Sequence, residues 1–497
     1  MEILEFSTYF AIIDFNMEDK NIIEWIRYSV AFRIAVVAIL ALLLLIPVAM
    51  IQELVRERES TKIGAVSEIA QKWGEQQTIV GPIISVPYRK SVLDENGQRT
   101  VITEYAHFLP KTLSVNGTLS PEIRSRGIFD AVVYSSEINL SGEFKQPNLQ
   151  TLGVADGDVD WNNAFVAVGI SDVRGINENA SLDWNKNPIQ FEPGVKTSDV
   201  IRNSGLNNYD TKPYYGNTSR DMSMPQPAEF WPITTGNTSG LSARVPLNIE
   251  RWKTTPHTFS FNLHLNGSSD LQFVPVGKTT EVTLASTWDS PSFSGAFLPD
   301  TREISDTGFD ASWKIFDLNR GYPQSWIGSS YDVYASASGV KLLAGVDGYT
   351  KTTRSAKYAI LIIALTFLVF FFAEILNKKM IHPIQYILVG LALVLFYALL
   401  ISISEIAGFG LAYLIASVAT IALITAYSKS IHLNQNIALL QGGVLAFLYV
   451  FIYIILQLED YALLMGSIFL FLILSSVMYF SRKIDWYAIG NNTRDNQ

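Results

Sequence analysis

The stretch IQYILVGLALVLFYALLISISEIAGFGLAYLIASVATIALITAY, residues 384–427, contains a single charged side chain, Glu405. A helix needs roughly 20 apolar residues to cross the ~30 Å hydrocarbon core of a bilayer. The stretch is long enough to cross twice, from Ile384 to Ile403 and from Ile406 to Tyr427, with Glu405 in the connection. A buried helix of a soluble protein is usually shorter and keeps a polar face. The pattern therefore predicts two transmembrane helices.

Four more segments have the same character: Ile34 to Ile51, Tyr358 to Leu376, Ile437 to Leu456 and Tyr461 to Phe480. The first is longer than the apolar run of a signal peptide, and no A-x-A-like cleavage site follows it, which favours an uncleaved anchor. We expect an integral membrane α-helical protein with six transmembrane helices, one N-terminal and five C-terminal.

Basic residues in the short flanks predict the orientation. They precede the first span, lie between spans two and three and between spans four and five, and follow the sixth: Lys20, Arg27, Arg33, Lys378, Lys379, Lys429, Arg482 and Lys483. Because Lys and Arg are retained on the cytoplasmic side, both termini are expected in the cytoplasm. The protein is then a multi-pass protein of a bacterial inner membrane, with its large domain in the periplasm.

These expectations divide the chain into five parts. Residues 1–33 are a cytoplasmic segment, 34–51 the anchor, 52–357 a periplasmic domain, 358–480 a five-helix bundle and 481–497 a cytoplasmic tail.

Composition excludes several classes of function. The formal net charge is −9, so no basic footprint for nucleic acid is present. The chain has no Cys, which excludes disulfides, thiolate metal sites and Cys nucleophiles.

The periplasmic domain is expected to begin with a helix that continues the anchor. Apolar residues recur at i, i+3 and i+4 from Ile63 to Trp73, and Gly74 is a plausible C-cap. We expect the apolar stripe of this amphipathic helix to pack on the neighbouring β-structure. The alternative is that it lies in the membrane surface or docks on a partner.

Beyond Gly74 the apolar residues alternate with a period of two, which is typical of strands. Asn96-Gly97 and Asn266-Gly267 are hairpin-turn signals between such runs. The fold class predicted is a β-rich, antiparallel, sandwich-like domain with two lobes. The Asn-, Asp- and Gly-rich stretch 148–232 is the expected place for long loops and the lobe boundary.

We find no catalytic, cofactor or metal motif. None of the five His residues forms an H-E-x-x-H pair, and His257 and His264 fall on opposite faces of a predicted strand. Asp156, Asp158 and Asp160 alternate as in a calcium loop, but Trp161 replaces the required Gly and Ala167 the required Glu. No nucleophile elbow or phosphate-binding loop appears in a supporting context. We therefore predict a protein without catalytic residues, cofactor or metal.

The predicted bundle is poor in polar features. Its five spans hold no ionisable residue deep in the membrane core. Glu374 lies near the cytoplasmic end of its span. The clearest polar cluster is Gln441 with Gly442-Gly443. Small residues such as Ala412, Ala416 and Ser417 favour close helix packing. A compact bundle is therefore favoured over a conduit.

Five strings, in order along the whole chain, resemble the CreD family of bacterial inner-membrane proteins. They are EIAQKWGEQQ (68–77), GPIISVP (81–87), VGISDVRGI (168–176), WDSPSFSGAFLP (288–299) and LNRGYP (318–323). The segment Met1 to Lys20 is longer and more apolar than the family leads us to expect. The resemblance implies a role in cell-envelope integrity and stress response, regulation by the Cre two-component system, and a link to β-lactam response and colicin tolerance. It supplies no catalytic residues.

Two of these strings suggest a recognition surface. Asp172 and Arg174 are two residues apart, so they can share one face of an extended segment and form an ion pair. A structural pair is the simpler interpretation. The functional hypothesis is that they form a recognition surface with Asn319 and Arg320.

Three functions remain open. The first is a non-enzymatic membrane scaffold or sensor, whose periplasmic domain binds a protein, peptidoglycan or lipid partner. The second is a transporter or lipid-handling protein that uses the C-terminal bundle, with membrane lipids as partners in either case. The third is an envelope hydrolase. The first is favoured, because no catalytic constellation competes and sheet edges can bind partners by strand addition.

Overall fold

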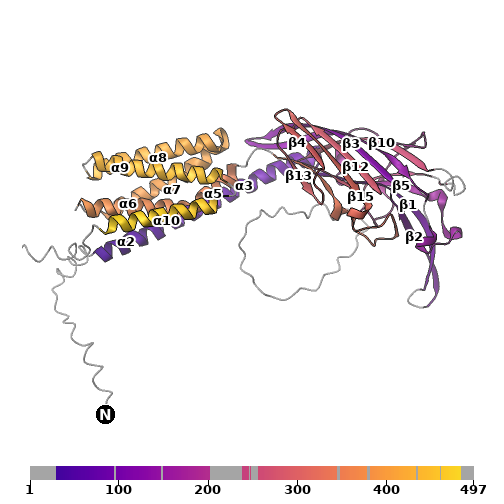
Figure 1. The fold of residues 1–497 in the computed structure, drawn as a ribbon, viewed down its shortest axis with the longest axis horizontal. Helices are drawn as coiled ribbons and strands as arrows, with labels where there is room; N and C mark the ends of the chain where they lie inside the picture. Colours follow the sequence, from indigo (N-terminus) through magenta and orange to yellow (C-terminus); the bar gives the residue numbers. More distant parts are fainter. Residues whose placement is uncertain are drawn as a thin grey trace, which may run out of the picture. The chain divides into compact units, whose positions relative to one another are not determined.

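The computed structural model describes residues 30–93, 97–146, 149–201, 238–245, 247, 256–343, 348–377, 381–432, 435–458 and 461–482 (Figure 1). The chain forms two compact units. Met1–Thr61 and Asp347–Gln497 make up a helical unit, and Lys62–Val346 make up a β-rich unit. The division into five parts predicted from the sequence remains a prediction beside these two units.

The helical unit is built from long helices that run lengthwise beside one another (Figure 1). They are α2 (Val30–Leu43), the first part of α3 (Leu45–Trp73), α5 (Gly348–Lys357), α6 (Ala359–Leu376), α7 (Pro383–Ala407), α8 (Phe409–His432), α9 (Gln435–Gln457) and α10 (Ala462–Ser481). Pro47 explains the break between α2 and α3. In a regular helix its ring would collide with the carbonyl of Leu43, four residues earlier.

Four helices of the described chain are long and apolar enough to cross a membrane: Phe32–Trp73, Pro383–Ala407, Phe409–Ile431 and Gln435–Gln457. Lys351–Lys357 and Ala359–Ile375 are bent by 43° and would form a fifth as a pair, while Leu463–Tyr479 is a shorter apolar helix. Long apolar helices are thus confirmed at both ends of the chain. The count of six spans stays a prediction.

The helices bury one face and expose the other, and both faces are apolar. In α7, Leu393 and Phe396 are buried, whereas Leu395 and Leu388 are exposed. Such an open leucine face is unfavourable in water but suits contact with lipid tails. Gly390 lets the first helices approach α7 closely, because a Cβ at this position would collide with the side chain of Leu44.

An ionic contact marks each end of α7. Near its start, the Tyr386 hydroxyl donates to Glu374 (2.9 Å), and Arg33 lies 3.3 Å from the same carboxylate. Near its end, Arg58 lies 3.8 Å from the Glu405 carboxylate, which also accepts from the Tyr349 hydroxyl (2.9 Å). From Tyr386 to Glu405 the helix rises about 28 Å at ~1.5 Å per residue, close to the ~30 Å hydrocarbon thickness. Glu374 lies near the end of α6 (Ala359–Leu376), and its position at the end of a membrane span stays a prediction.

The β-rich unit contains two mixed sheets (Figure 1). The first has the order β13-β17-β11-β1-β5-β9-β8, with β2 beside β1 and β16 beside β2. Its strands are β1 (Gln77–Leu93), β2 (Arg99–Phe108), β5 (Phe165–Ile170), β8 (Glu192–Val195), β9 (Thr238–Arg244), β11 (Asp270–Val274), β13 (Pro291–Gly295), β16 (Ser325–Ile327) and β17 (Ser338–Leu342).

The second sheet has the order β14-β15-β12-β3-β4-β10-β6-β7. Its strands are β3 (Thr112–Arg126), β4 (Phe129–Phe144), β6 (Ser181–Trp184), β7 (Asn187–Gln190), β10 (His257–Ser268), β12 (Thr279–Ser286), β14 (Thr301–Ser305) and β15 (Gly308–Phe316). Both sheets contribute to one hydrophobic core, with Phe165 and Val168 from the first and Leu140 and Phe261 from the second.

The sequence predicted antiparallel sheets, and both sheets are instead mixed. β1 pairs with β11 in parallel, and β12 pairs with β3 in parallel. Parallel partners must be joined by long connections, and the period-two pattern of a strand is the same for either direction. Sequence alternation therefore could not distinguish the two arrangements.

One of the two predicted turns is wrong as well. Asn266 and Gly267 belong to β10 and pair with Ser135 and Tyr134, and the chain turns instead at Ser269, where φ is +60°. The other predicted turn, Asn96-Gly97, lies between β1 and β2, which pair as a hairpin with Leu93 opposite Arg99. This hairpin is confirmed, although Asn96 itself lies outside the described residues. Of the predicted loop stretch 148–232, the structure describes residues 149–201. This part contains β5 to β8 and short 3₁₀ turns.

Candidate functional site

The site begins where helix α3 ends against the β-rich unit. Trp73 donates its indole N–H to the carbonyl of Tyr134 (3.2 Å), and the Arg124 guanidinium lies 3.5 Å from the indole ring centroid. Gly74 follows with φ +150°, and a Cβ at this position would lie 2.5 Å from the Asn266 carbonyl oxygen. The predicted end of the helix at Gly74 is confirmed. Trp73, the last residue of the apolar stripe, contacts the β-structure, while Ile63 at its start is 56% exposed; packing of the whole stripe stays a prediction.

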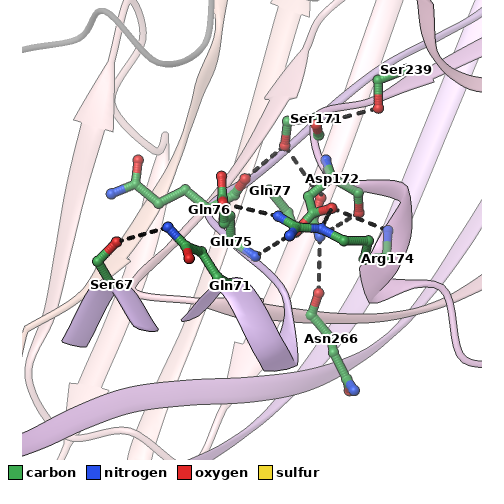
Figure 2. A network of polar contacts seen from close by, with 10 residues as sticks. All are labelled: Ser67, Gln71, Glu75, Gln76, Gln77, Ser171, Asp172, Arg174, Ser239 and Asn266. Carbon is green, nitrogen blue, oxygen red and sulfur yellow. Dashed lines mark hydrogen bonds and ion pairs between the residues drawn. The ribbon is translucent and has the colours of Figure 1, made fainter. Parts of the chain in front are cut away.

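Asp172 is the centre of a polar network just beyond this helix end (Figure 2). It caps a 3₁₀ turn and accepts the backbone N–H of Arg174 (3.1 Å) on one oxygen. Its other oxygen accepts the backbone N–H of Glu75 (2.9 Å). The Arg174 guanidinium donates to both Asp172 oxygens, at 2.8 and 3.0 Å, and to Glu75 at 2.9 Å. The predicted pairing of Asp172 with Arg174 is thus present, and Glu75 makes it a triad.

Gln77 extends the network into the interior (Figure 2). Its side chain is fully buried and donates to the carbonyls of Asp172 (3.0 Å) and Asn266 (2.9 Å). Gly175 is required beside it, because a Cβ there would collide with the Asn266 carbonyl oxygen and lie 2.6 Å from the Gln77 amide nitrogen. The site therefore joins the end of α3, the segment after β5 and strand β10.

The charges of the triad stabilise one another. Burial by itself raises the pKa of the Asp172 carboxyl, but hydrogen bonds from the Arg174 side chain and the Glu75 backbone lower it below its usual range. Hydrogen bonds to Asp172 and Glu75 raise the pKa of Arg174. Asp172 is 7% exposed, whereas the Arg174 side chain is 56% exposed. Arg174 and the Glu75 side chain, which is 37% exposed, are therefore the parts of the network open to a partner.

Asn319 and Arg320 lie in a separate turn after β15. The Asn319 side chain accepts the Phe316 backbone N–H (3.1 Å). Arg320 is buried, donates to the carbonyls of Val276 (3.2 Å) and Gly277 (3.3 Å), and lies 4.3 Å from the Tyr322 ring. Among the described residues, no hydrogen bond, ion pair or ring contact links this turn to Asp172 or Arg174. A surface shared by all four residues stays a hypothesis.

Sequence reasoning missed a Ser–His–Asp chain in the first sheet. The Ser85 hydroxyl lies 2.9 Å from His107 Nδ1, and His107 Nε2 lies 3.3 Å from Asp199. The three residues are far apart in sequence, and only the β1–β2 register places Ser85 opposite His107. Ser85 and His107 are buried, and the Ser85 backbone pairs with strands on both sides. The Asp199 side chain, at the outer end of this chain of contacts, is 25% exposed.

The other residues considered as ligands lie apart. His257 is buried and stacks on Trp184, while His264 is on the other face of β10, as predicted. Asp156 and Asp158 are exposed in a 3₁₀ turn. Within the described ranges, no group of three or more His, Asp or Glu side chains is placed to hold a metal ion.

Comparison with known proteins identifies the family. The family model described as inner membrane protein CreD matches residues 29–487. The chain belongs to the CreD family. A curated member, inner membrane protein CreD of Escherichia coli (strain K12), is 32% identical over 463 residues, which cover 90% of this chain and 92% of the relative. The long apolar helices are therefore those of a CreD-family inner membrane protein.

Two of the strings that carry the CreD resemblance meet at the site. EIAQKWGEQQ supplies the end of α3 with Glu75 and Gln77, and VGISDVRGI supplies Asp172 and Arg174. The string LNRGYP supplies the separate turn with Arg320.

Proposed function

We propose that this CreD-family protein is a non-enzymatic support of cell-envelope integrity and envelope stress response, with its β-rich unit as the periplasmic binding or scaffold module. The observation that carries the proposal is the network at the end of α3. This helix runs without interruption from Leu45 to Trp73, and Glu75 and Gln77 bind directly to Asp172 and Asn266. In this proposal, α3 connects the module to the helical unit within one continuous helix.

The topology belongs to the same proposal. We take α2 with α3, α6, α7, α8, α9 and α10 as six spans, with both termini in the cytoplasm and a sandwich-like periplasmic domain. Arg33 with Glu374 would then mark the cytoplasmic end of the bundle, and Glu405 the periplasmic end. The basic residues that flank the spans support this orientation.

The partner we propose is a periplasmic protein, peptidoglycan or lipid that binds a sheet edge or the exposed side of Arg174. Strand β14 is an outermost strand of its sheet and is exposed along its whole length. Such an edge can accept another strand. The burial of Ser85 and His107 supports a non-catalytic role.

The experiment is complementation of a strain that lacks the protein, under envelope stress. The full chain is compared with a version that ends after Lys379, which keeps the β-rich unit and its two flanking helical segments. Both must be present at equal abundance. Rescue by the short form is expected. Failure of the short form at normal abundance would instead place the activity in the bundle.

The recognition surface is tested separately with the double variants Asp172→Ala/Arg174→Ala and Asn319→Ala/Arg320→Ala. Protease resistance of the β-rich unit serves as the folding control, because Asp172 and Arg320 are buried. We expect loss of complementation by the first pair in the folded, membrane-inserted protein. Full activity of a folded and abundant first pair would end the hypothesis.

A transporter or lipid-handling role is the second candidate. It is favoured by uncharged polar side chains buried between α7, α8 and α9, among them Tyr397, Ser428 and Gln441.

A further inference from the structure

One face of helix α8 carries a row of polar side chains. Tyr413, Ser417, Thr420 and Ser428 are all buried. Their spacing places them on one side of a helix with 3.6 residues per turn. From Tyr413 to Ser428 the row extends about 22 Å at ~1.5 Å per residue. Gln441 of α9 meets it at one end, where its amide oxygen accepts from the Ser428 hydroxyl.

At the other end, three tyrosines from three helices gather around Phe396. Its ring centroid lies 4.9 Å from that of Tyr397, 5.4 Å from that of Tyr413 and 4.7 Å from that of Tyr449. All three tyrosines are at most 3% exposed. We call Tyr397, Tyr413 and Tyr449, together with the polar row of α8, the polar seam.

The hydroxyls of the seam differ in whether they are satisfied. Tyr413 donates to the carbonyl of Tyr449 (2.8 Å), and Ser417 donates to the carbonyl of Tyr413 (2.6 Å). The hydroxyls of Tyr397 and Tyr449 are buried and have no hydrogen-bond partner among the described residues. In a bilayer, a buried hydroxyl cannot turn to bulk water, so an unpartnered one is unfavourable. Two such hydroxyls in one aromatic cluster indicate a ligand that accepts hydrogen bonds.

The seam also limits the charge of that ligand. The sequence of α9 has no Asp, Glu, Lys or Arg, and α7 and α8 have none between Pro383 and Ser404 or between Phe409 and Tyr427. An ion at this depth would need a counter-charge. The ligand must therefore be uncharged.

We propose that the seam between α7, α8 and α9 is a binding site for a small uncharged hydroxyl group that accepts hydrogen bonds from Tyr397 and Tyr449. The hydroxyl is supplied by water, or by the glycerol or sugar part of a neutral lipid headgroup. This site is independent of the β-rich unit. It adds a polar binding function to a bundle that the sequence presents as an anchor.

The test measures whether each substitution raises or lowers the thermal unfolding midpoint of the full-length protein in lipid nanodiscs. If a ligand occupies the site, Tyr397→Phe and Tyr449→Phe remove its hydrogen bonds and lower the thermal unfolding midpoint. Tyr413→Phe loses a bond that the structure shows, so its lowered midpoint calibrates the expected size. If nothing is bound, the same two variants remove an unsatisfied hydroxyl and raise the midpoint.

Two further measurements identify the source of the hydroxyl. Radiolytic hydroxyl-radical labelling should modify Tyr397 and Tyr449, despite their burial, if ordered water is the ligand. Native mass spectrometry with diacylglycerol-containing membranes should find a retained neutral lipid, lost in the Tyr397→Phe/Tyr449→Phe variant, if a headgroup is the ligand. The proposal requires a lowered midpoint and one of these two ligands. Any other combination of results overturns it.

Discussion

At the scale of single residues, the junction between α3 and the β-rich unit depends on carboxylates that are used in opposite ways. Asp172 is buried but surrounded by donors, so its charged form is stabilised. Asp270 begins the neighbouring strand β11, and one of its carboxylate oxygens is buried with no partner among the described residues. The same kind of side chain therefore stabilises the fold at one position and opposes it at the other.

This difference predicts a pH effect. Burial raises the pKa of Asp270 from its usual 3.8 to about 6, although Lys341 and Gln272 act in the opposite direction. Because the pKa of Asp270 is higher in the folded than in the unfolded protein, protonation of this carboxyl stabilises the fold. This contribution to the free energy of unfolding is fully present below about pH 4 and is lost as pH rises through about 6. We expect Asp270→Asn to be more stable than wild type at pH 7.5, by at most ~3 kcal/mol, and the gain to vanish near pH 4.

Chemical unfolding of the full chain at a series of pH values measures this gain. Asp183→Asn, the same substitution at an exposed position on β6, is the matched control. A gain that is equal at pH 4 and pH 7.5 would contradict the assigned cause.

At the scale of elements, α3 both continues the apolar helix α2 and ends on the β-structure. Arg126 of β3 pairs with Glu68, which also binds Lys72 of the same helix at 3.0 Å, so a β-strand contacts the last turns of α3. Gly64 lies upstream of these contacts, and a Cβ there would meet no atom within 4 Å. The helix can thus be changed at this point without altering any packing.

Gly64 provides a direct test of a continuous helix. Gly64→Ala should raise helix stability by about 1 kcal/mol, and Gly64→Pro should break the helix at a cost of ~3 kcal/mol. We expect complementation to survive the alanine and to be lost with the proline, at equal abundance. Equal activity of the two variants would show that the junction does not need an unbroken α3.

The elements also show how far sequence patterns reach. Apolar runs and period-two alternation depend on local burial, so they predicted the long helices, the end of α3 at Gly74 and the flanks of the Leu93–Arg99 hairpin. Pairings between distant strands leave no local signal, which is why the parallel pairs and the Ser85–His107 contact were missed. Glu75 was missed as the third member of the site for the same reason.

At the scale of the whole molecule, the helical unit depends on one buried carboxylate that joins helices far apart in sequence. Glu374 of α6 is 5% exposed and binds Arg33 of α2 and Tyr386 of α7. Glu374→Ala should destabilise the helical unit by about 3 kcal/mol, because a buried ion pair loses one partner. Glu374→Gln should cost less, since its amide oxygen still accepts from Tyr386. Thermal unfolding in nanodiscs measures both, and an alanine variant as stable as wild type would refute the role.

The first sheet has a consequence for how such a protein can be rebuilt. Gln77, where the chain enters the sheet, and Val340, near where it leaves, both lie opposite Leu271 of β11. They flank one strand, so they are about 10 Å apart, twice the ~4.8 Å strand spacing. The β-rich unit is thus an insertion whose two ends meet at one place. A short Gly-Ser bridge could replace it, and foreign domains with adjacent termini could be exchanged for it.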